Sequence, residues 1–449
     1  MPSCEAEGST LARSPARGSL RQNVSWTVVG NFGFAACQWL MLVVLAKSGS
    51  AAMVGQFALA LSLTAPIMLM SNLNLRAVQT TDVDDEYAFA TFFRLRAATT
   101  MLSLAVCLVI VTVATFSRDT ALVIGFVALA KAAESMSDVF YGRLQKNERM
   151  DRIAKSMLIR GAASLIAMAV LVSVTSSVVW GACGVFVAWL IVLLLYDLRS
   201  TAGEPVTSHL RGSLFREWDS QGLRTLLSLA WLALPLGIVQ MFISLNTNIP
   251  RFFIQASSGE HALGIYSAIA YVTVAGSTFV AAVGQAVSPR LAHLYASGDR
   301  KGFVRLLQIL AGFFVACCVL ALVLVLNAGE YVLSTLYTPE YAKESPLLII
   351  MTLSFGVGSL VSVLGFGITA ARRFRPQVPL VVLAVIIATV ASAILVPRFG
   401  ITGAAWAILA SLAVWSIASA GVLWSALSGL GAPSTTLDQK EAAILAAKP

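Results

Sequence analysis

Charged residues are scarce in this chain, because Asp, Glu, Lys and Arg together make up 12% of its 449 residues. A soluble globular domain carries about 25%. The six cysteines include no Cys-x-x-Cys pair, and the three histidines are scattered at His209, His261 and His293. This pattern excludes a structural zinc site and a disulfide scaffold. The sequence also lacks GxxxxGK[ST], so the chain does not hydrolyse nucleotide at a P-loop.

The chain contains many long apolar runs. The chain is 58% hydrophobic, with a mean hydropathy of +0.82. About 20 apolar residues cross the hydrocarbon core as a helix, and the runs do not alternate as barrel strands do. We therefore predict an all-α polytopic membrane protein with about 12 transmembrane helices. The expected spans are 24–46, 51–72, 97–116, 120–141, 157–176, 178–197, 226–249, 262–286, 304–326, 346–370, 377–397 and 402–427.

Most of the 31 Lys and Arg residues lie in the two tails or in every second gap between these runs. The other gaps hold only Lys47, Arg118, Arg251, Lys343 and Arg398. Cytoplasmic loops of membrane proteins carry excess Lys and Arg, so both termini are expected in the cytoplasm. The net charge of +9 has the same origin, and nucleic acid is not an expected partner.

The spans divide into two sets of six. The predicted units are a cytoplasmic tail (1–23), an N-terminal lobe (24–197), a cytoplasmic linker (198–225), a C-terminal lobe (226–427) and a second tail (428–449). A shift of 209 positions pairs Gly55 with Gly264 and Phe57 with Tyr266 at the same place in each lobe. Each lobe has an even number of spans, so the repeat is expected to be parallel, about an axis along the membrane normal.

Charged residues inside the span 120–141 are the first candidate site. Lys131, Glu134 and Asp138 are three and four residues apart and share one helix face. A charge in mid-membrane needs a partner or water. One interpretation is a polar face lining a hydrophilic cavity. The other is a Lys–Glu pair that fixes helix packing.

Polar groups in other spans extend this candidate substrate-binding set. Arg251 is one of the few cations expected on the external side of the membrane. There its side chain either binds an anion or extends to the membrane–water interface. The amides are Asn31, Gln38, Asn72, Asn74, Gln240, Asn248 and Gln285. Such amides also act as contacts between membrane helices. The aromatic and basic stretch that ends at Arg96 is expected to form an interfacial helix.

Several local sequences resemble the oligosaccharide flippases, the Wzx-type polysaccharide biosynthesis transporters of the MOP superfamily. The resemblance covers about 24–427 and rests on residues 55–76, 138–161, 244–254 and 262–295, which include GQFALALSLTAPIMLMSNLNLR and SLNTNIPRFFI. It implies two six-helix bundles in a MOP/MATE-like arrangement around a central cavity. It also implies transport of an undecaprenyl-diphosphate-linked oligosaccharide for surface or exopolysaccharide biosynthesis, such as lipopolysaccharide. By position, Arg251 and Lys131 would hold the diphosphate or acidic sugars.

This resemblance implies a multi-pass protein of the bacterial inner membrane, with membrane lipid, a polysaccharide polymerase and export machinery as further partners. No catalytic residues, metal ligands or cofactors are expected, and the coupling ion is left open between H+ and Na+. The alternative function is a cation-coupled multidrug or metabolite antiporter, which would use Glu134 or Asp138 as its switch. An enzyme such as a membrane polymerase is not expected, because the longest external connector, about 327–345, is too short for a catalytic domain.

Overall fold

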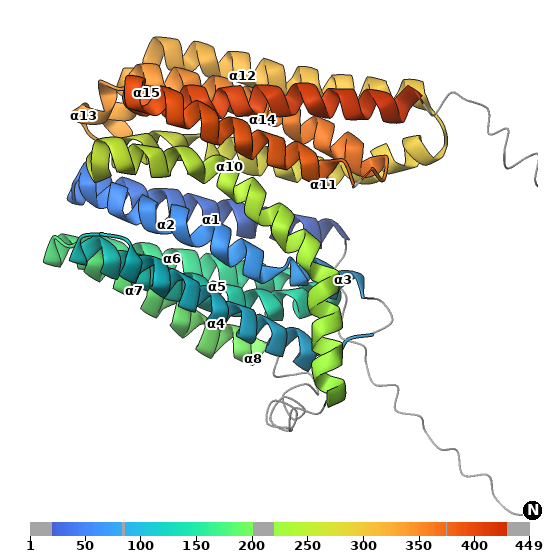
Figure 1. Ribbon diagram of the computed structural model, residues 1–449, viewed down its shortest axis with the longest axis horizontal. Coiled ribbons are helices and arrows are strands. Elements are labelled where there is room, and N and C mark those ends of the chain that lie inside the picture. The colour runs from blue at the N-terminus through green and yellow to red at the C-terminus, as the bar shows by residue number, and fades with distance from the viewer. Residues whose placement is uncertain (1–19, 83–85, 201–219, 374, 429–449) are drawn as a thin grey trace, which may run out of the picture.

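The computed structural model describes residues 20–82, 86–200, 220–373 and 375–428 (Figure 1). The first part of the chain forms a group of helices that we call the N-half. Its members are α1 (Leu20–Ser48), α2 (Ala51–Asn72), α3 (Leu75–Thr81), α4 (Phe89–Val113), α5 (Arg118–Lys146), α6 (Met150–Thr175), α7 (Val178–Val192), the π-helical turn η1 (Leu193–Asp197) and α8 (Leu198–Ser200).

The second part, the C-half, is helical as well. Its members are α10 (Ser220–Val272), α11 (Val274–Ala296), α12 (Arg300–Leu336), α13 (Pro339–Ala342), α14 (Ser345–Ala370) and α15 (Gln377–Ser428). Local capping explains where several helices begin. Ser50, Ser117 and Asp299 each accept a hydrogen bond from a backbone N–H in the first turn of the helix that follows.

Ten helical segments within the described residues are long and apolar enough to cross a membrane. Two of these, Gly222–Val272 and Gln377–Ser428, have 51 and 52 residues. A straight helix of that length would measure about 75 Å, against about 30 Å of hydrocarbon. Each instead bends at a glycine with positive φ, Gly259 at 77° and Gly400 at 57°. The all-α membrane fold is confirmed, whereas the number of twelve crossings stays a prediction.

The outer surface is apolar, as a lipid-facing surface must be. Large hydrophobic side chains are left exposed on many of the helices, among them Met101 at 69%, Ile166 at 62%, Trp231 at 78% and Ile417 at 75%. A soluble protein would bury such side chains or leave them singly exposed. Here they occur around both halves, which suits helices whose solvent is hydrocarbon.

The two halves pack against each other along α2 and α10 (Figure 1). Gly55 and Gly264, the pair matched by the internal repeat, lie at this contact. A Cβ on Gly55 would lie 1.7 Å from the carbonyl oxygen of Glu260, and one on Gly264 would lie 1.8 Å from that of Ala51. Only glycine allows this approach, since small residues let membrane helices touch through their backbones. We call this contact the glycine seam.

Side-chain hydrogen bonds reinforce the seam at one end of the molecule. The Trp39 indole donates to the Tyr337 hydroxyl at 3.0 Å, and Lys47 donates to the carbonyl of Thr335 at 2.8 Å. Burial raises the pKa of Tyr337 to about 12, so its hydroxyl stays protonated and donates to the carbonyl of Ala268. The Thr120 hydroxyl donates to the Glu260 carboxylate. We call this the closed end.

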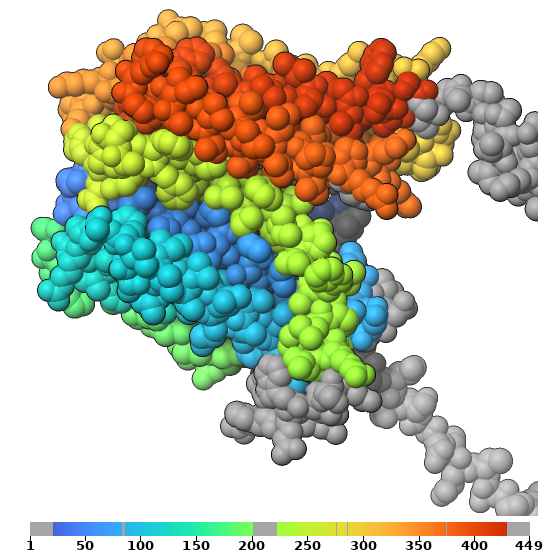
Figure 2. All heavy atoms as spheres, viewed as in Figure 1, coloured from blue at the N-terminus to red at the C-terminus, as the bar shows by residue number. Residues whose placement is uncertain are grey.

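The other end of the molecule, where the described chain begins and finishes, is more open. Figure 2 shows a notch between the two halves there, beside the first part of α10. That part of α10 reaches across to the N-half, where Leu229 and Ala233 pack with Leu73, Phe92 and Leu95. We call this end the terminal end. The closed end carries the short helix α13 (Figure 1). The turns at Gly259 and Gly400 lie beside α13, because the residues around them line one pocket with Glu340.

Some expected boundaries were wrong. The connector predicted at 327–345 is largely the continuation of α12 to Leu336, followed by α13. The stretch before Arg96 begins α4, so it is not a separate interfacial helix. The lobe limits of 24–197 and 226–427 stay predictions. Most of the predicted tails (1–23 and 428–449) and of the predicted linker (198–225) lies outside the described residues.

The glycine seam generates a prediction about stability. We expect Gly264→Ala to lower the thermal unfolding temperature of the detergent-purified protein, because its Cβ would force the backbones of α2 and α10 apart. Gly365→Ala is the matched control, since nothing lies within 4 Å of a Cβ at that helical position. The control is expected to gain stability by up to about 1 kcal/mol. Equal unfolding temperatures for the two variants would contradict the role of the seam.

Candidate functional site

A column of polar side chains runs along α5 inside the N-half. Lys131 Nζ donates to Glu134 Oε2 at 2.8 Å, so the predicted pair is present. Asp138 follows one turn later, toward the terminal end, and all three lie on the face that spacing predicts. The side chains of Lys131 and Glu134 are 21% and 26% exposed. The pair is therefore neither sealed in the core nor open to bulk solvent.

Glu134 also serves a second cation, Arg160 of α6. Arg160 Nη2 lies 3.4 Å from Glu134 Oε1, and the Arg160 side chain is only 2% exposed. Its guanidinium lies over the rings of Phe34 and Trp189, at 4.8 and 5.1 Å from their centroids. Cation–π contact with aromatic faces partly replaces the lost hydration. Lys131 Nζ lies over the same Trp189 ring at 5.3 Å.

Arg160 was missing from the sequence-predicted set. It lies within the expected span 157–176, close to the basic connector that precedes it. Its position in the span was the signal that could have revealed it, since an ionisable residue within a membrane helix points to a functional site. Within the described structure, Arg160 Nε and Nη1 are buried and have no hydrogen-bond partner. An additional acceptor, such as water or an anion, would satisfy them.

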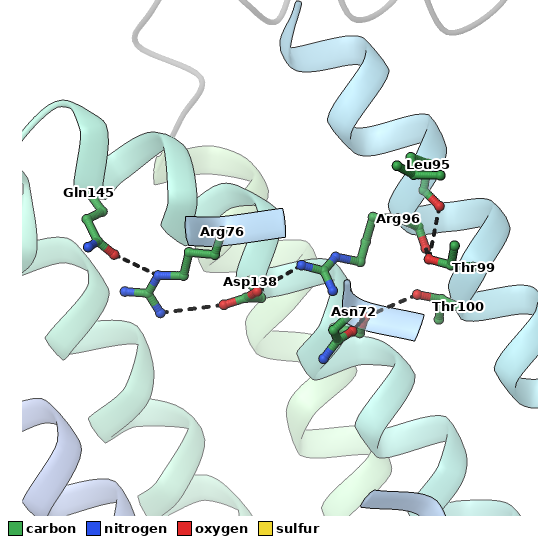
Figure 3. A network of polar contacts seen from close by, with 9 residues as sticks. Asn72, Arg76, Leu95, Arg96, Thr99, Thr100, Asp138 and Gln145 are labelled. Atoms are coloured by element: carbon green, nitrogen blue, oxygen red, sulfur yellow. Dashed lines mark hydrogen bonds and ion pairs between the residues drawn. The ribbon is translucent and has the colours of Figure 1, made fainter. Parts of the chain in front are cut away.

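Asp138 joins two further arginines nearer the terminal end (Figure 3). Arg96 Nη2 donates to Asp138 Oδ2 at 2.9 Å, and Arg76 Nη1 lies 3.5 Å from Oδ1. Arg76 Nε also donates to Gln145 at 2.8 Å. The Arg96 side chain is fully buried, and its Nε and Nη1 have no partner among the described residues. Neither arginine was predicted, because both were assigned to a cytoplasmic connector.

Hydroxyl and amide groups fill the space between these charges (Figure 3). Ser135 donates to Asn72 Oδ1 at 2.5 Å and lies 3.1 Å from the Thr100 hydroxyl. Asn72 is thus one member of the predicted set that the structure brings to the column. The groups come from α2, α4 and α5, so the column ties three helices of the N-half together.

A buried carboxylate, Asp197, extends the network on another face of α5. It accepts hydrogen bonds from Ser137 at 2.6 Å and Ser156 at 2.5 Å. The Ser156 hydroxyl lies 2.6 Å from the Tyr141 hydroxyl. The guanidinium carbon of Arg160 lies 5.7 Å from the centroid of the Tyr141 ring. Asp197 ends the π-helical turn η1. Single π-helical turns inside α-helices are frequent at functional sites.

Arg251 lies between the two halves. The structure corrects its expected place in an external connector, because α10 remains helical up to the turn at Gly259. Arg251 Nη1 donates to Asn248 Oδ1 at 2.8 Å and to the Ser62 hydroxyl of α2 at 3.3 Å. Its Nε is buried without a partner in the described structure. The Arg251 side chain therefore points into the contact between the halves and does not extend to the membrane–water interface.

The other predicted amides are less well supported. Asn74 has a left-handed backbone conformation, with a φ of 49°, in the turn between α2 and α3. This backbone conformation explains why an asparagine is found at this position. Asn31 is exposed, Gln38 and Gln240 are partly buried, and none of the three makes a side-chain hydrogen bond within the described residues. The side chain of Gln285 lies outside the described part of the structure.

The column favours an anionic ligand over a metal ion. Within it, the cations are Lys131, Arg160, Arg96 and Arg76, and the carboxylates are Glu134, Asp138 and Asp197. Two of the arginines keep buried N–H groups that are not satisfied. Guanidinium groups suit phosphate oxygens in geometry and charge. In the described residues, no group of three His, Cys, Asp or Glu side chains is placed to hold a metal ion.

Solved structures share this fold. The lipid II flippase MurJ in an inward closed conformation has a TM-score of 0.69 at 11% identity, covering 90% of this chain and 89% of that one. An inward-facing MATE multidrug transporter of the MOP superfamily has a TM-score of 0.63 at 12% identity, covering 91% and 96%. At such identities the likeness concerns the fold alone. The chain therefore has the architecture of MOP-superfamily membrane transporters.

Sequence comparison then defines the family. The polysaccharide biosynthesis protein family matches residues 20–295, more than half of the chain, and this protein belongs to that family. The capsular polysaccharide biosynthesis protein CapF of Staphylococcus aureus is 28% identical over 394 residues, which are 87% of this chain and 96% of CapF. The family resemblance drawn from the sequence is confirmed, and the chain is a multi-pass membrane protein with the fold of MOP-superfamily transporters.

The shared carboxylate gives a second prediction. Glu134→Gln is expected to destabilise the protein by about 3 kcal/mol, because it removes the carboxylate that pairs with both Lys131 and the buried Arg160. Lys131→Met is expected to cost about 1 kcal/mol or less, since the Glu134–Arg160 contact survives. Chemical unfolding in detergent, followed by tryptophan fluorescence, measures the two free energies. A larger loss for Lys131→Met would show that Glu134 does not serve both cations.

Proposed function

We propose that this protein moves an undecaprenyl-diphosphate-linked oligosaccharide across the bacterial inner membrane by alternating access. Family membership supports a role in polysaccharide biosynthesis. The relative CapF is named for capsular polysaccharide biosynthesis, and the structural neighbour MurJ is described as a lipid II flippase. In this proposal the sugar and diphosphate pass between the halves while the lipid tail remains in the bilayer.

The observation that carries the proposal is Arg251 at the contact between the halves. A diphosphate cannot enter hydrocarbon without groups that replace its hydration. Arg251 presents a guanidinium with a buried, unpartnered Nε to the N-half, across from Ser62. The cations of the α5 column lie in the N-half, where Lys131 and the carboxylate of Asp138 are only partly buried. Together they provide acceptors and donors along a route from the terminal end.

The closed and terminal ends fit one state of an alternating cycle. The glycine seam and its hydrogen bonds hold the halves together at one end, and the notch in Figure 2 lies at the other. The basic residues Arg143, Lys146, Arg290 and Arg300 lie toward the terminal end, in the order that positive-inside loops require. We therefore assign the terminal end, with both termini, to the cytoplasm and the state to an inward-open one.

A driving force for this cycle comes from an ion gradient, the membrane potential or the substrate gradient. The partly buried carboxylates Glu134 and Asp138 are the groups that would exchange H+ or Na+ in a coupled cycle, and no resident cofactor is required. The same groups would be the switch of a cation-coupled antiporter. Transport of the lipid-linked sugar separates the two functions, because an antiporter for soluble compounds would not move it.

The direct test is a flipping assay with purified protein in liposomes that contain a fluorescent undecaprenyl-diphosphate disaccharide. An impermeant external quencher removes the fluorescence of the outer leaflet, so the further loss of protected fluorescence with time gives the rate at which lipid leaves the inner leaflet. We expect Arg251→Ala to slow flipping at least about tenfold, the equivalent of one lost charge-assisted hydrogen bond. Arg251→Lys is expected to retain part of the rate, because the charge remains but the fork of N–H groups does not.

Arg305→Ala is the matched control, since Arg305 is exposed on α12 and away from the contact between the halves. Its rate is expected to equal that of the unmodified protein. No flipping by the unmodified protein, together with counter-transport of a cationic dye against an H+ gradient, would overturn the proposal in favour of the antiporter.

A further inference from the structure

A pocket of about 560 Å³ lies in the C-half at the closed end of the molecule. It forms where the turn at Gly259, the helix α13 and the turn at Gly400 come together. The side chains that matter here are Ser258, His261, Glu340, Lys343, Glu344 and Phe399. Small-ligand sites measure about 300–1,000 Å³, so this volume suits one or two sugar rings. None of these residues belongs to the α5 column.

The charges of this pocket are opposite to those of the α5 column. His261 Nε2 lies 2.8 Å from Glu340 Oε1, which joins the second part of α10 to α13. Glu344 and Lys343 complete the charged lining, so two carboxylates face one lysine and one histidine. With neutral histidine this lining has a net charge of −1, and it repels phosphate and uronic acids. Hydroxyl, acetamido and amino groups are the ligand groups that such a lining accepts.

An exposed aromatic ring adds an apolar face to these polar groups. Phe399 is 60% exposed although it is a large hydrophobic residue, and it directly precedes the positive-φ Gly400 that turns α15. The ring therefore stands at the rim of a polar pocket and is not packed in the core. A pyranose ring has one apolar C–H face and a polar edge. Phe399 can cover that face while the carboxylates and Ser258 bind the edge.

We propose that this pocket binds the neutral or amino-sugar part of the transported oligosaccharide at the closed end. The proposal rests on the proposed function and assigns the two chemistries of the substrate to separate places. The arginines of the N-half and Arg251 hold the diphosphate, whereas the acidic pocket receives sugar and selects against acidic sugars. Because the pocket lies wholly in the C-half, it exists whether or not the two halves are closed.

Saturation-transfer difference NMR tests this assignment with the full-length protein in detergent. The probes are two free disaccharides, chitobiose for N-acetylhexosamine and a hyaluronan disaccharide that contains a uronic acid. We expect saturation transfer to chitobiose and little or none to the uronic acid disaccharide. Phe399→Ala is expected to weaken chitobiose binding about fivefold, which corresponds to one lost ring contact. Glu344→Gln is expected to reduce the discrimination against the uronic acid.

Matched controls lie on the nearby exposed surface of α12. Tyr331→Ala removes an aromatic side chain that is 73% exposed, and Glu330→Gln removes an exposed carboxylate, both outside the pocket lining. These variants are expected to bind both disaccharides as the unmodified protein does. Absence of chitobiose binding, or equal binding by Phe399→Ala, overturns the proposal. Failure here is distinct from failure of the flipping assay, because the NMR test needs neither diphosphate nor lipid.

Discussion

The need to match every charge placed inside the membrane organises the N-half. Glu134 is shared by Lys131 and Arg160, and Asp138 is shared by Arg76 and Arg96. These two carboxylates draw α3, α4 and α6 around α5, because an unpaired ion there costs several kcal/mol. The pairing is incomplete, since both buried arginines retain N–H groups without an acceptor in the described structure. The same arginines therefore stabilise the packing of the N-half and remain able to bind a ligand.

The C-half contributes few charges to this interior, and its backbone approaches the N-half most closely at glycines. Gly55 and Gly264 bring the backbones of α2 and α10 together, and Trp39, Lys47 and Thr120 add hydrogen bonds at the closed end. Large apolar side chains of both helices, among them Phe57 of α2 and Tyr266 of α10, are buried in the same core cluster. Arg251 lies near this seam, so its surroundings change whenever the halves move. Movement of the halves and exposure of the anion-binding groups are therefore linked.

Sequence patterns predicted the membrane class, the helical fold and the family, and they gave the Lys131–Glu134 pair as one of two interpretations, because hydropathy and helical spacing act over short distances. The repeat that matched Gly55 with Gly264 was also informative, since the structure places the two glycines together. The sequence did not predict Arg96 and Arg160 as site residues, because a cation at the end of an apolar run looks the same whether it faces water or a carboxylate. Arg251 was assigned to a connector because the expected span 226–249 ends before it, whereas α10 stays helical up to the turn at Gly259. The periodicity of a sequence does not determine which helices contact each other.

The central claim is that the chain transports a lipid-linked sugar, and the location of that lipid in living cells tests it most directly. The measurement is deletion of the gene in its own host, followed by extraction of undecaprenyl-linked intermediates and determination of their leaflet with an impermeant sugar-modifying enzyme. The account predicts loss of surface polymer and accumulation of a complete oligosaccharide–lipid in the cytoplasmic leaflet, restored by the unmodified gene. Unchanged surface polymer with the intermediate still reaching the outer leaflet would contradict it.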